Sequence, residues 1–169
     1  MLFSSLEFLY LYLPVTLLLY FVIPLRFRNI VLLLVSLAFY GWGEPAYLGL
    51  MVATILIDYA AGLLIERNRD NARRAKGWMI TAVVVNLGFL AFFKYSGFIL
   101  DNLRLIPALS ALPSFDVALP IGISFYTFQA LSYVIDVYRG KQEDQKDLLK
   151  LTLFVTFFPQ MVQGPISRY

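Results

Sequence analysis

The chain has 169 residues, of which 60% are apolar, 17% are aromatic and only 15% are charged. Soluble domains are about half apolar and a quarter charged, so a soluble core of this length leaves too much apolar surface in water. The sequence has no cysteine and no histidine, which excludes disulfides, thiolate chemistry and a histidine base within these residues, and its net charge of +3 gives no support for nucleic-acid binding.

Six apolar runs, most of them near the length of a membrane span, follow one another along the chain. The third has 20 residues, about 30 Å of helix, which matches the thickness of the hydrocarbon layer. The second has only 14 residues, about 21 Å, so we expect it to be short, re-entrant or set in a thinned bilayer. We predict an all-α, polytopic transmembrane bundle with about six spans, at residues 6–23, 29–42, 46–65, 78–100, 121–138 and 148–162.

The 14 Lys and Arg residues concentrate in alternate loops, which indicates an orientation. Short cytoplasmic loops hold an excess of these residues. With a periplasmic N-terminus, 3 of them fall outside, and 11 fall inside: Arg26, Arg28, Arg67, Arg69, Arg73, Arg74, Lys76, Arg139, Lys141, Lys146 and Lys150. Omitting any crossing would reverse every later loop and spoil this asymmetry. We therefore predict six crossings, with both ends of the chain outside.

Several polar residues fall within the apolar runs, where they need a partner, a cavity or a role. They are Glu7, Asp58, Asn86, Lys94, Gln129 and Asp136. Asp58 lies about 18 Å along its predicted helix from Ala46, well inside the apolar layer. Each of them fits a hydrogen-bonded contact between helices, or a charge near a membrane end, as well as a functional group. For Lys94, we expect a side chain that extends outward to the membrane interface and not a catalytic role.

The fifth run carries its polar residues on one face. Gly122, Tyr126, Gln129, Tyr133 and Asp136 are spaced by 4, 3, 4 and 3 residues, an arc of about 80° on a helix. Such a stripe favours a face turned toward protein or water and away from lipid. The pattern leaves two interpretations open: a polar seam between helices, or one wall of a substrate tunnel.

The last run contains two prolines, Pro159 and Pro165. A backbone broken at membrane depth persists only where protein or water satisfies its freed groups, so we expect a re-entrant or cavity-lining element, or else an ordinary helix end near Gly164. The sequence has no nucleophile elbow, no phosphate-binding loop and no metal-ligand cluster. No catalytic residue and no metal site is therefore assigned.

Residues 119–129, LPIGISFYTFQ, and 132–140, SYVIDVYRG, resemble the membrane-bound O-acyltransferase family, in its branch of bacterial alginate O-acetyltransferases. Three further stretches agree with this resemblance: LAFYGW at 37–42 followed by EPAY at 44–47, FFPQ at 157–160 and GPISR at 164–168. The likeness extends from near Met1 to the last residue. The resemblance implies that the motif positions maintain the fold and line the walls of a substrate tunnel. These positions are Pro120, Gly122, Phe125, Tyr126, Gln129, Tyr133, Asp136, Gly164, Pro165 and Arg168.

The resemblance implies a multi-pass enzyme of the bacterial inner membrane that transfers an acyl group to a hydroxyl of an exported polysaccharide, such as alginate or another cell-envelope glycan. It implies an acetyl donor as substrate, either acetyl-CoA or a carrier-linked acetyl group, and no bound cofactor. Its partners would be the lipid bilayer and the periplasmic acetylation machinery. The intramembrane histidine that serves as base in this family would lie beyond residue 169.

The chain is expected to be a single transmembrane domain over residues 1–169, the N-terminal part of the acyltransferase fold, truncated at its C-terminal end and inactive alone. Two alternatives stay open: a transporter or channel-like subunit, and a non-catalytic membrane fragment. A histidine within a later helix would indicate the enzyme, whereas further paired or broken helices would indicate a transporter.

Overall fold

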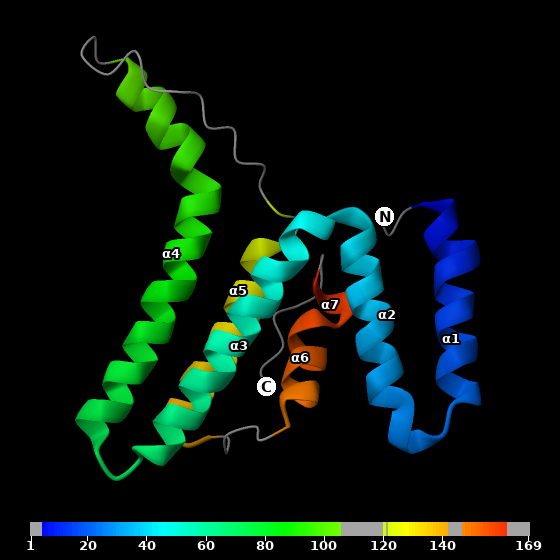
Figure 1. The fold of residues 1–169 in the computed structure, drawn as a ribbon, viewed down its shortest axis with the longest axis horizontal. Coiled ribbons are helices and arrows are strands. Elements are labelled where there is room, and N and C mark those ends of the chain that lie inside the picture. The colour runs from blue at the N-terminus through cyan, green and yellow to red at the C-terminus, as the bar shows by residue number, and fades with distance from the viewer. Residues whose placement is uncertain (1–4, 106–119, 121, 142–146, 162–169) are drawn as a thin grey trace.

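The computed structural model describes residues 5–105, 120, 122–141 and 147–161, which form a bundle of helices (Figure 1). The described residues contain no strand, and the prediction of an all-α membrane bundle is confirmed. The elements, in chain order, are the π-helical turn η1 (Phe8–Tyr12), α1 (Leu13–Val22), the 3-10 turn η2 (Leu25–Phe27), α2 (Arg28–Gly43), α3 (Pro45–Arg67), α4 (Ala72–Arg104), α5 (Ile123–Tyr138), α6 (Leu148–Thr156) and α7 (Phe158–Met161).

Among the described residues, three helices are long and apolar enough to cross a bilayer: α2 with its preceding turn, α3 and α4. The second run, which the sequence marked as doubtful, is therefore one of the three, because the turn at Leu25–Phe27 extends it to 19 residues. The helical segments at Phe8–Val22 and Leu148–Gln160 are apolar but shorter. A total of six crossings stays a prediction.

The fourth helix is longer than its apolar run. It spans 33 residues, Ala72–Arg104, where the sequence predicted only 78–100. Most of residues 66–76, between the third and fourth apolar runs, are therefore helical, and α4 continues past the end of its run to Arg104. Arginine and lysine are good helix formers, and the Asn71 side chain accepts a hydrogen bond from the Arg74 amide at 3.1 Å, which caps α4.

Consecutive helices run in alternating directions, and the basic residues gather at one end of the bundle. The α1–α2 turn, the α3–α4 turn and the facing ends of α5 and α6 lie at the lower end in Figure 1. Those segments hold the basic residues that the sequence assigned to the inside, apart from Lys146, which lies outside the described residues. This arrangement agrees with the predicted alternation of loops.

The centre of the bundle is the contact between α3 and α5, which lie side by side with α4 against both (Figure 1). Gly62 on α3 makes this approach possible. A Cβ atom built at Gly62 would lie 2.9 Å from Cε1 and Cζ of the Tyr133 ring on α5, which is too close. Small residues are the usual means by which helices approach closely in membranes, where there is no water to drive their association.

An aromatic cluster joins the N-terminal helix to the rest. The rings of Phe8 and Tyr12 contact those of Phe39 on α2 and Phe158 on α7, with centroids 5.4 to 6.1 Å apart. The Tyr12 hydroxyl also donates a hydrogen bond to the Val35 carbonyl at 2.6 Å. These contacts attach η1 and α1 to the bundle through α2 and α7.

Replacing Gly62 by alanine is expected to destabilise the protein by about 1 to 3 kcal/mol, because the new methyl group overlaps the Tyr133 ring. The matched control is Gly49→Ala on the same helix, where a Cβ meets nothing within 4 Å. That change is expected to be neutral or stabilising by up to about 1 kcal/mol, since alanine favours helix. Titration of the purified full-length protein with denaturing detergent measures both; equal effects would contradict the close approach.

Candidate functional site

The fifth helix begins at a glycine that the backbone requires. Gly122 has a φ of 76°, in the left-handed region that glycine adopts without a Cβ penalty, and its carbonyl accepts the first helical hydrogen bond from the Tyr126 amide at 3.0 Å. Pro120, two residues earlier, is buried. The predicted motif residues Pro120 and Gly122 thus form the entry to α5 and set the direction in which the helix leaves.

The polar stripe of α5 is buried. Tyr126, Gln129, Tyr133 and Asp136 are all exposed by 7% or less. Phe125, which the family motif groups with them, instead lies on another side of the helix and is 37% exposed. The structure therefore brings four of the predicted positions to one packed face and separates Phe125 from them.

The stripe meets different neighbours along its length. At its beginning, the Tyr126 ring lies perpendicular to that of Tyr40 on α2, with centroids 6.4 Å apart. The hydroxyl groups of both tyrosines are buried, and they interact with each other. Further along, Tyr133 covers Gly62, so this part of the stripe is a seam with α3.

Gln129, in the middle of the stripe, is hydrogen-bonded to the broken last helix. Its Nε2 donates to the Phe154 carbonyl at 2.7 Å and to Oε1 of Gln160 at 3.1 Å. The break lies between α6 and α7 at Phe157, just before Pro159, where the sequence predicted an interruption. The second predicted break, at Gly164 and Pro165, lies outside the described residues, as does Arg168.

Asp58 and Asn86 form a second buried polar group, between α3 and α4. The Asn86 Nδ2 donates to Asp58 Oδ1 at 2.7 Å and to the Ala82 carbonyl at 2.9 Å, and both residues are 1% exposed. Among the described residues, Asp58 Oδ2 and Asn86 Oδ1 have no partner. Because isolated buried polar groups are costly, this pairing supports the interpretation of Asp58 and Asn86 as a contact between helices.

The surface grooves of the described residues include one beside the helix break and one on α4. One of about 310 Å³ lies beside the helix break and is lined by Leu32, Lys150, Leu153, Phe154, Phe157 and Gln160. A larger one, of about 640 Å³, is lined by residues of the upper part of α4 alone. Since the buried stripe lines neither groove, a tunnel wall along α5 stays a prediction.

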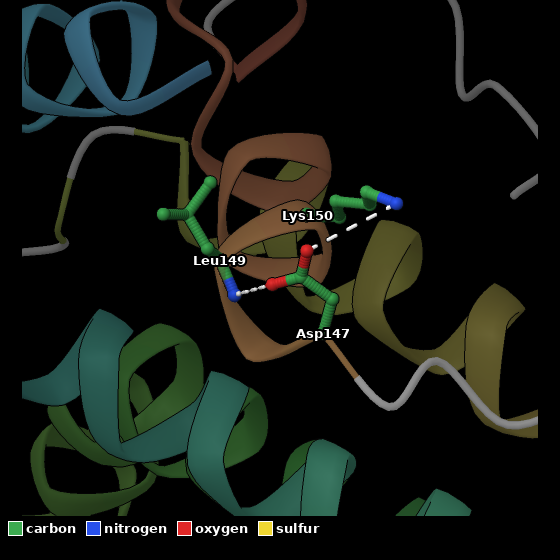
Figure 2. A network of polar contacts seen from close by, with 3 residues as sticks. All are labelled: Asp147, Leu149 and Lys150. Atoms are coloured by element: carbon green, nitrogen blue, oxygen red, sulfur yellow. Dashed lines mark hydrogen bonds and ion pairs between the residues drawn. The ribbon is translucent and has the colours of Figure 1, made fainter. Parts of the chain in front are cut away.

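The charged start of α6 is an ordinary helix terminus. Asp147 accepts a hydrogen bond from the Leu149 amide at 3.0 Å, and its carboxylate lies 4.0 Å from the Lys150 amine (Figure 2). This is a helix N-cap, in which a side-chain oxygen accepts a hydrogen bond from an otherwise unpaired amide of the first turn. The described residues contain no group of three His, Cys, Asp or Glu side chains placed to hold a metal ion.

Sequence analysis did not single out three residues that the structure places at these contacts: Ser36, Tyr40 and Gly62. The run of small residues at 60–62 within an apolar helix was a signal for a close helix contact. Ser36 lies in an apolar run that gave no sign of its partner, and Tyr40 lies in the motif stretch LAFYGW, which did not indicate a contact with α5.

The chain matches no family model and no solved structure. Among curated proteins, it is 41% identical over 172 residues to a probable alginate O-acetylase of Azotobacter vinelandii, covering 100% of the chain and 34% of that relative. It is 32% identical over 198 residues to the peptidoglycan O-acetyltransferase of Helicobacter pylori, covering 100% of the chain and 37% of that relative.

A more distant match is the teichoic acid D-alanyltransferase of Bacillus subtilis, 37% identical over 49 residues, which are 29% of the chain and 12% of that protein. The chain thus spans only 34% of the length of the alginate O-acetylase and 37% of the length of the peptidoglycan O-acetyltransferase, although both match all of the chain. The names of the three relatives describe transfer of an acetyl or D-alanyl group, in connection with alginate, peptidoglycan and teichoic acid respectively.

The hydrogen bond between Asp58 and Asn86 is expected to couple the two residues. Asp58→Leu or Asn86→Leu alone leaves the other polar group buried without its partner, whereas the double substitution removes both groups. The double variant is expected to be destabilised by less than the sum of the two single effects. The expected difference is about 0.6 kcal/mol, the average for such bonds in membranes, and at most about 1.7 kcal/mol.

Unfolding of the full-length protein in denaturing detergent measures this coupling. The matched control pairs Asn86→Leu with Thr54→Val, since the buried Thr54 hydroxyl donates only within α3, to the Leu50 carbonyl. That pair is expected to be additive. Additivity in the Asp58 and Asn86 pair as well would contradict a stabilising contact.

Proposed function

We propose that the protein containing this chain is an O-acyltransferase of the membrane-bound O-acyltransferase family, and the similarity of the whole chain to alginate O-acetylases supports this proposal. Its reaction transfers an acetyl group to a hydroxyl of an exported polysaccharide, alginate or another cell-envelope glycan. The observation that carries this proposal is the 41% identity that extends over 100% of the chain.

The protein is a multi-pass protein of the inner membrane, with a periplasmic N-terminus. Two observations support this orientation: the alternating direction of the helices, and the collection of basic residues at one end of the bundle. Cytoplasmic loops carry the excess of Lys and Arg, so that end faces the cytoplasm. Residues 1–169 are one transmembrane domain within the larger enzyme.

The donor is an acetyl group from the cytoplasm, on coenzyme A or on a carrier, and the acceptor sugar lies outside. A charged donor does not diffuse through lipid, so the protein provides a polar path between the two sides and shields the acyl group from water. The motif residues of α5 contribute walls of that path. The base that activates the acceptor hydroxyl is a histidine in the part of the enzyme beyond this chain, which itself has none.

The proposal is tested by expressing the complete protein in membranes with its polysaccharide, its associated proteins and a labelled acetyl donor. Label is expected to appear in base-labile esters on the sugar, and replacement of the downstream intramembrane histidine by alanine is expected to abolish it. Absence of acetyl esters with the intact protein would contradict the proposal. Donor-independent movement of solutes across the membrane would instead favour a transporter.

The orientation has its own test, because the chain contains no cysteine. Single cysteines at Ala46, at the α2–α3 turn, and at Asp70, in the α3–α4 turn, place exposed labels at opposite ends of the bundle. In intact cells, a membrane-impermeant maleimide is expected to modify Ala46→Cys and to reach Asp70→Cys only after the inner membrane is opened, with other cysteines of the full-length protein replaced. Labelling of both from the same side would contradict the topology.

A further inference from the structure

The interruption between α6 and α7 frees backbone groups inside the bundle. Phe157 has φ −56° and ψ 110°, which takes it out of the helix, and Pro159 has no amide hydrogen to continue the α6 ladder toward Val155. A regular helix would join the Phe154 carbonyl to the Phe158 amide. At the break, the ψ of Phe157 takes the backbone out of this pattern.

Each freed group is bound by a side chain from another helix. The Phe154 carbonyl accepts the hydrogen bond from Gln129 on α5, at 2.7 Å. The Phe158 amide donates to the Ser36 Oγ on α2, at 3.3 Å, across 122 positions of sequence. Gln129 and Ser36 are 2% and 0% exposed, so no bulk water competes for these groups.

The break lies deep in the membrane. Helix α6 has 9 residues, about 14 Å, and it starts at the basic end of the bundle, so Phe157 lies near the middle of a hydrocarbon layer about 30 Å thick. Irregular backbone at that depth exists only where protein or water satisfies it. The two side-chain caps are thus a condition for the break.

We infer that Gln129 and Ser36 are positioning residues, which together fix the break and so the orientation of α7 between α2 and α5. The Gln129 amide reaches both sides of the break, since it also donates to Gln160 on α7 at 3.1 Å. In the sequence, the family motif of Gly164, Pro165 and Arg168 follows α7 directly. The relevance of this positioning to acyl transfer rests on the function proposed above.

The position of the break is measured by cross-linking in the full-length protein, with its other cysteines replaced. Leu32 on α2 and Phe157 line the same groove, as does Leu153, which precedes the break on α6. Paired cysteines at Leu32 and Phe157 therefore report on the break, and paired cysteines at Leu32 and Leu153 report on α6 itself. A short bis-maleimide joins either pair in membranes.

Gln129→Leu and Ser36→Ala are each expected to reduce the yield of the Leu32 to Phe157 cross-link about fivefold, the factor that corresponds to one lost hydrogen bond. The Leu32 to Leu153 yield is expected to stay unchanged. Ser132→Ala is expected to behave as wild type, and it is a matched control because the Ser132 hydroxyl donates within its own helix, to the Gln129 carbonyl at 2.7 Å.

Unchanged cross-linking at Phe157 in both variants would overturn the inference. An equal loss at both cysteine pairs would overturn it too, because it would show general unfolding of α6. In the acetylation assay, Gln129→Leu and Ser36→Ala are expected to lower kcat with little change in KM for the donor. If the wild-type protein makes no esters, the proposed function fails, and the cross-linking result still decides the positioning role.

Discussion

A hydrocarbon solvent cannot satisfy a polar group, and this constraint organises the whole chain. Backbone amides and carbonyls are paired within helices, and the polar side chains of α5 are buried against neighbouring helices. The same constraint explains the Asp58 and Asn86 pair, in which the Asn86 side-chain amide donates a hydrogen bond to the Asp58 carboxyl group on a neighbouring helix. Polar side chains here act mainly as contacts between helices, and the apolar residues occupy the surface that faces lipid.

The elements of the fold were predictable because their signals are local. Apolar runs near the length of a membrane span predicted the helices. The positions of the basic residues between the runs agree with the alternating helix directions in Figure 1. Helix ends were less predictable. Hydropathy cannot detect where a helix continues into water, and the basic first turn of α4 is helical because its residues favour helix and Asn71 caps it.

The partners of the site were beyond local signals. Periodicity showed that Gln129 and Tyr133 share a face, and the structure places both in buried contacts. The partner of Gln129 is the Phe154 carbonyl and that of Tyr133 is Gly62, and both come from other parts of the chain. Ser36 lies 122 residues from the amide that it accepts from, so only the folded bundle brings them together. Pro159 predicted a break in the helix, but no local pattern indicated which groups stabilise that break.

The length of α4 relates the chain to the thickness of the membrane. Lys76 and Lys94 are 18 residues apart on this helix, about 27 Å, close to a hydrocarbon layer of about 30 Å. Lys94 is exposed, and its amine lies 5.7 Å from the centre of the Tyr95 ring, a pair of the kind that anchors helices at the interface. The spacing of the two lysines is thus close to the thickness of that layer, whereas α4 as a whole, with 33 residues or about 50 Å, is longer than the layer.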